Sequence, residues 1–243
     1  MAIGTITFGG KATVASTTSS SVAVNISTSS TCELVVVGIA VTGTSALTTT
    51  VNFAGVAMTM VGSIVATSEG NVQLWYTTSN TNSRSNVTVQ YSNKNGLANS
   101  CYVSWYNAPA SLVLSDDENG FSTSGQAAQL NLLSGVNNGF VAVDIWHSGY
   151  STTNGTTNNR TLLYQEDRGN LIAASQYGLD DGTSSYAMLH TTPSSDDWAM
   201  IAASWIDNST SAFASVNTVL YSDVDSIDGV LKGNIGSVDD LLF

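Results

Sequence analysis

The two histidines, His147 and His190, are the side chains best suited to acid–base or zinc chemistry in this 243-residue sequence. Neither belongs to a His-x-x-x-His or Cys–His cluster, so the sequence offers too few ligands for a zinc site. A Gly-x-Ser-x-Gly nucleophile motif, a P-loop and a dinucleotide-binding glycine pattern are absent as well. His147 follows Trp146 near the end of a predicted strand, which favours a surface or interface position. The sequence therefore predicts no catalytic residue, metal site, cofactor or enzyme activity.

Paired carboxylates are the second group that could do chemistry. Glycoside hydrolysis needs two carboxylates about 5–9.5 Å apart, and calcium binding needs about six to eight oxygen ligands. The acidic segments 116–120 and 180–182 lack the full spacing of an EF-hand loop. Because the pairs stand among turn-forming residues, we expect solvated turn carboxylates rather than a catalytic or calcium site. The pairs are Asp116-Asp117-Glu118, Glu166-Asp167, Asp180-Asp181, Asp196-Asp197 and Asp239-Asp240.

Cys32 and Cys101 are the two cysteines, and each stands beside a predicted strand. Two cysteines are too few for a disulfide framework, and they form no metal-ligand pattern. They could form a single bridge, or they could be two small buried hydrophobic side chains. The second interpretation is favoured, because free cysteine is among the most buried residue types.

Aromatic side chains raise the question of carbohydrate binding, since flat rings can stack on sugars. Trp75, Trp105 and Trp205 fall within predicted strands, where packing in the core is the expected role. Trp146 and Tyr150 are the better candidates for exposure and hence for binding. This pair carries the alternative hypothesis of a carbohydrate- or receptor-binding module.

Charge excludes two classes of partner. The chain has 18 acidic and 6 basic residues and a formal net charge of -12. So few dispersed cations cannot neutralise many phosphates, which argues against nucleic-acid binding, and the acidity argues against docking on an anionic membrane. The first residues show no secretory signal, and no run approaches the about 20 apolar residues of a membrane helix. We expect a protein made in the cytoplasm without a signal peptide.

A period of two dominates the sequence and predicts an all-β domain over residues 1–207. Apolar and polar residues alternate over 21–27, which is typical of a half-buried strand. The continuous apolar run 34–41 predicts a central strand, and Gly/Asn/Ser turns separate the runs, as in a sandwich or barrel. The other predicted strands are 51–54, 56–61, 72–78, 86–91, 101–107, 128–133, 139–147, 161–166, 184–191 and 197–206.

The alternation also predicts which way side chains face. In the strand 139–147, Val141, Val143 and Ile145 form the inward set, and Asp144 and Trp146 face the other side. The strand 198–205 carries apolar residues on both faces. It could lie under a loop or under a neighbouring subunit, which hints at assembly.

The character of the chain changes after residue 207. Segment 208–243 starts as a linker, and its strand-like alternation fades. We expect it to be a C-terminal docking tail, because its apolar side chains should not stay in water: Ile227, Val230, Leu231, Ile235, Leu241, Leu242 and Phe243.

Three stretches resemble a known group of proteins. Residues 51–59 resemble a hairpin turned by Asn-Phe-Ala-Gly, residues 72–78 and 86–90 look like the strand pair that follows it, and residues 197–203 are similar to a closing strand. This order is similar to that of jelly-roll, lectin-like β-sandwich proteins of tailed bacteriophages and related bacterial surface proteins. The tail around Ile227-Asp228-Gly229-Val230 is similar to C-terminal elements of phage structural proteins.

The resemblance covers residues 20–206 and the tail and carries no catalytic residue. It implies a two-sheet antiparallel jelly-roll (concanavalin-like) sandwich on the exterior of a virion. The expected function is a capsid decoration protein or head-fibre subunit that acts by assembly. Expected partners are the major capsid protein or fibre proteins and further copies of the chain, with a trimer as the first expectation.

Overall fold

The structure is a computed structural model in which the chain divides into two units, Met1–Asn208 and Ser209–Phe243. It describes residues 6–43, 49–65, 70–79, 81–82, 84–91, 97–109, 111–133, 139–148, 160–168, 171–179, 185–207, 226–227 and 230–231. Strands and no helix occur in these ranges, so the predicted all-β class is confirmed. Within the same ranges no helix is long and apolar enough to cross a membrane.

The strands of the first unit form three antiparallel sheets. In spatial order, sheet A contains β1 (Thr7–Thr17), β9 (Asn99–Asn107), β3 (Cys32–Thr42), β7 (Gly70–Thr77) and β6 (Thr59–Val65). Sheet B contains β2 (Ser21–Val24), β8 (Val87–Tyr91), β4 (Thr49–Phe53) and β5 (Val56–Ala57). Sheet C contains β10 (Leu112–Leu133), β14 (Ser185–Asp207), β11 (Phe140–Ser148), β13 (Leu171–Leu179) and β12 (Arg160–Arg168).

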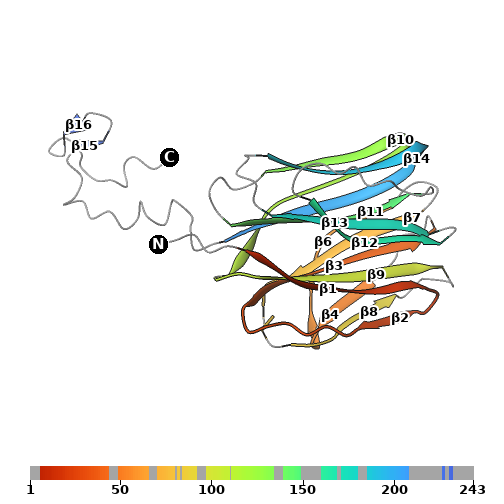
Figure 1. Ribbon diagram of the computed structural model, residues 1–243, viewed down its shortest axis with the longest axis horizontal. Helices are drawn as coiled ribbons and strands as arrows, with labels where there is room; N and C mark the ends of the chain where they lie inside the picture. Colours follow the sequence, from red (N-terminus) through yellow and green to blue (C-terminus); the bar gives the residue numbers. More distant parts are fainter. Residues whose placement is uncertain are drawn as a thin grey trace. The chain divides into compact units, whose positions relative to one another are not determined.

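Sheet A is the middle layer, with sheet B on one face and sheet C on the other (Figure 1). Its strand β3 shows why: Leu34 and Val36 pack toward sheet C, whereas Val35 and Val37 pack toward sheet B. A strand that is apolar on both sides must be covered on both sides. The prediction of a central strand at 34–41 is therefore confirmed. The prediction of two sheets is wrong, because the described residues build a third.

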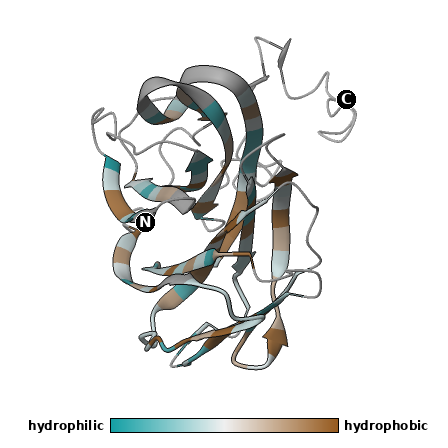
Figure 2. Ribbon diagram, turned by 90° about the vertical axis from the view of Figure 1, so that its right-hand side faces the viewer, coloured by the Kyte–Doolittle hydropathy of each residue, from teal (hydrophilic) through white to brown (hydrophobic). Residues whose placement is uncertain are grey.

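Strands β10 and β14 are far longer than their neighbours because each contributes one part to sheet C and another part to a layer that covers sheet C. Their register is shifted between Ser122 and Ala127, and beyond this point residues 127–133 pair with residues 185–191. We call these two segments the distal ribbon. Leu130, Leu132 and Met188 of the ribbon pack in one cluster with residues of β11, β13 and β14. The ribbon thus folds back over the outer face of sheet C. In Figure 2 the strands are banded because apolar and polar residues alternate along them.

The ribbon explains the strand with two apolar faces. Ala199 and Ile201 of β14 face sheet A, whereas Met200 and Ala202 face the distal ribbon. Both faces of residues 198–205 are therefore covered by the chain itself. The expectation that a neighbouring subunit or a loop covers this strand is wrong.

The stretches that carried the resemblance fold only partly as expected. Ala54 and Gly55 have φ values of 49° and 83°, which is a type I′ turn, and Asn52 pairs with Ala57 across it. The predicted hairpin turn is confirmed. The expected pairing of 72–78 with 86–90 is wrong, because β7 belongs to sheet A and β8 to sheet B. Residues 197–203, which were expected to form a closing strand, belong to β14. This strand is not at an edge, because it lies between β10 and β11 in sheet C.

Both cysteines are free and buried, which confirms the interpretation as small hydrophobic side chains and rules out the bridge. Both lie in the core between sheets A and B. Burial raises the pKa of the Cys32 thiol to about 11 and that of the Cys101 thiol to about 12.

Replacing Gly178 with alanine should loosen the distal ribbon. A Cβ at Gly178 would lie 1.7 Å from the hydroxyl oxygen of Tyr186 in the ribbon, so the two segments could no longer pack as closely. We expect Gly178→Ala to lower the free energy of unfolding by about 2 kcal/mol, measured by urea denaturation. Gly62→Ala is the matched control, because its Cβ would meet nothing closer than 3.6 Å. Equal effects of the two variants would contradict this packing.

The buried thiols should be inert in the folded protein. At neutral pH we expect neither cysteine to react with a thiol reagent, and both to react in denaturant without any reductant. Both thiols have higher pKa values folded than the ordinary 9.0, so the unfolded chain ionises first. Stability should therefore fall as the pH rises above about 9. A native thiol that reacts quickly, or fewer than two thiols in denaturant, would contradict the structure.

Candidate functional site: a buried polar network

Asp144 is a carboxylate with 0 % exposure in the middle of β11. The ladder between β11 and β13 is interrupted there: Val143 pairs with Tyr177 and Trp146 pairs with Ala174, but the residues between them do not pair. The side chain of Asp144 accepts a backbone hydrogen bond in place of the interrupted ladder. Its Oδ1 accepts a hydrogen bond of 2.9 Å from the backbone N–H of Gln176.

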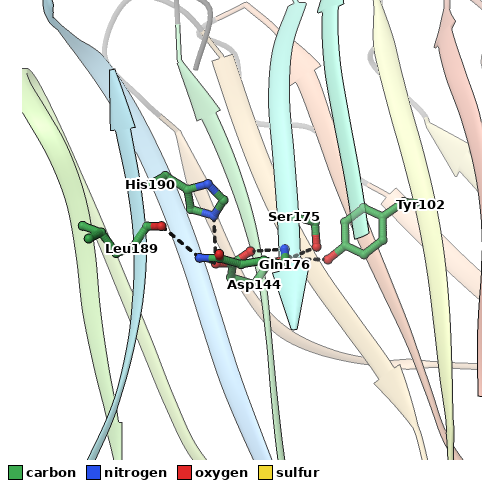
Figure 3. A network of polar contacts seen from close by, with 6 residues as sticks. All are labelled: Tyr102, Asp144, Ser175, Gln176, Leu189 and His190. Atoms are coloured by element: carbon green, nitrogen blue, oxygen red, sulfur yellow. Dashed lines mark hydrogen bonds and ion pairs between the residues drawn. The ribbon is translucent and has the colours of Figure 1, made fainter. Parts of the chain in front are cut away.

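The second carboxylate oxygen of Asp144 connects sheet C to the distal ribbon (Figure 3). Asp144 Oδ2 lies 2.8 Å from Nε2 of His190 and accepts a hydrogen bond of 3.1 Å from Nε2 of Gln176. The same Gln176 amide donates to the carbonyl oxygen of Leu189 at 3.0 Å. Both His190 and Leu189 belong to the ribbon strand β14, so this layer is held by polar as well as apolar contacts.

The main-chain carbonyl of Asp144 connects sheet C to sheet A on the opposite side. It accepts hydrogen bonds from the hydroxyl of Tyr102 in β9 and from the hydroxyl of Ser175 in β13. The ring of Tyr102 reaches this position by lying over Gly38, where a Cβ would be 1.8 Å from the ring. One residue therefore joins sheet A, sheet C and the distal ribbon.

An Asp–His pair is also the orienting half of a catalytic triad, in which the histidine must reach both a nucleophile and the substrate. The side chains of Asp144 and His190 have 0 % exposure, and the ring of Trp146 stacks on His190 at a centroid distance of 5.4 Å. The hydroxyl of Ser175 is directed at a carbonyl of Asp144. These contacts fit a structural role, because a buried charge needs donors close to it wherever it lies.

The structure corrects the predicted exposure of Trp146. The face predictions for Val141, Val143 and Ile145 are confirmed, since all three pack toward sheet A. Trp146 does face the other way, but its exposure is 0 % because the distal ribbon covers that face. His147 is also fully buried within the chain, so its predicted surface or interface position is wrong. Tyr150 lies outside the described residues.

Three of the five acidic groups lie in strands and not in the predicted turns. Asp116-Asp117-Glu118, Glu166-Asp167 and Asp196-Asp197 lie within strands β10, β12 and β14 rather than in turns. Glu166 is buried and accepts a hydrogen bond from the hydroxyl of Tyr164. Among the described residues no three histidine, cysteine or acidic side chains are grouped to hold a metal ion. Asp180-Asp181 and Asp239-Asp240 lie outside the described residues.

The predicted docking tail is described only at two short strands. Ile227 ends β15 (Ser226–Ile227), and Val230 and Leu231 form β16 (Val230–Leu231), which pairs antiparallel with β15. The remaining tail residues of the prediction, Ile235, Leu241, Leu242 and Phe243, lie outside the described residues. Docking of the tail stays a prediction.

Changing Asp144 to asparagine should destabilise the fold strongly. The amide has only one oxygen for the three donors that the carboxylate serves, and its NH₂ group faces a donor. We expect Asp144→Asn to cost about 3 kcal/mol of unfolding free energy, measured by chemical denaturation. In a double-mutant cycle with His190→Gln the two effects should be less than additive. Asp117→Asn, at an exposed position of β10, should leave stability unchanged, and an equal loss there would contradict the assignment.

Comparison with known proteins gives no independent identification. No family model, no curated protein and no solved structure matches the chain. The resemblance to phage proteins therefore remains a hypothesis, and function has to be argued from the residues and their arrangement.

Proposed function

We propose that the chain is a structural protein of the exterior of a tailed-bacteriophage particle, a capsid decoration protein or a head-fibre subunit. It acts by assembly and not by catalysis. Its partners are other virion proteins, such as the major capsid protein, and further copies of the chain. The protein is made in the host cytoplasm and reaches the outside with the particle.

The observation that carries this proposal is that the Asp144–His190 pair is buried and connects the layers of the fold. This is the constellation in the described residues that most resembles acid–base machinery, and its contacts join three layers of the fold. A pair enclosed in this way contributes a fixed arrangement of layers rather than a reaction. A rigid body with several stacked sheets suits a component of a shell or fibre.

The virion context draws on the sequence. The resemblance of residues 51–59, 72–78, 86–90 and 197–203 suggested it, and of these the hairpin in 51–59 folds as expected. The jelly-roll or concanavalin-like connectivity belongs to the same proposal. Sheets A and C pack face to face as two antiparallel sheets, which supports a sandwich, and sheet B is then an added layer.

The alternative, a carbohydrate- or receptor-binding adhesin, has less support. It depended on Trp146 and Tyr150 as exposed aromatic residues, and Trp146 is enclosed under the distal ribbon. We therefore favour assembly over ligand binding as the function.

Fractionation of purified phage particles tests the proposal. We expect the chain to remain with heads after tails are separated, and a variant lacking residues 221–243 to bind heads at lower occupancy, because the tail carries the predicted docking residues. The measurement is quantitative mass spectrometry of each fraction. Recovery of the full-length chain only in the soluble fraction of the lysate would refute a virion role. Normal occupancy of the truncated chain would refute only the anchoring role of the tail.

A further inference from the structure

We draw no further inference here: the strongest candidate, the pair of indole N–H groups that Trp146 and Trp198 hold beneath the distal ribbon, belongs to the buried site already described, and nothing in the described residues shows a route by which a ligand would reach it.

Discussion

The fold depends on the burial of one carboxylate, that of Asp144. A charge without contact with water is stable only where donors surround it, and here the donors come from Gln176 and His190, 32 and 46 positions away along the chain. Its main-chain carbonyl draws the hydroxyls of Tyr102 and Ser175 to the same place. These segments can satisfy Asp144 only in one relative arrangement. The network therefore selects how sheet A, sheet C and the distal ribbon are aligned.

The apolar contacts alone would not make this selection. Strands β3, β11 and β14 are apolar on both faces, so they require covers on both sides, but many registers would bury similar areas. A buried polar network penalises each alternative register, because a shift leaves the carboxylate or its donors unpaired. Its contribution is thus the specificity of the layers more than their total stability. Close contacts over Gly38 and Gly178 act in the same direction, since only these positions admit the rings of Tyr102 and Tyr186.

The sequence predicted the strands that alternate or that are wholly apolar, such as 34–41 and 139–147, since their patterns are local. It missed β1, β13 and the first half of β10, whose small and polar residues lack a clear period. Alternation assigned Trp146 to the correct face of β11 and still gave the wrong exposure, because a strand pattern does not show what lies on the face. The polar network could not be predicted for the same reason. An aspartate in the apolar run 141–146 was the one local signal that a buried partner was needed.

The edges of sheets B and C connect the fold to its proposed role. Strand β10 forms an edge of sheet C that needs protection from pairing, and Asp116, Asp117 and Glu118 lie along it. Sheet B has short edge strands of four and two residues, so its edges offer little to pair with. An edge protected by charge and edges kept short are two ways in which this chain limits strand pairing outside the contacts that its proposed role requires.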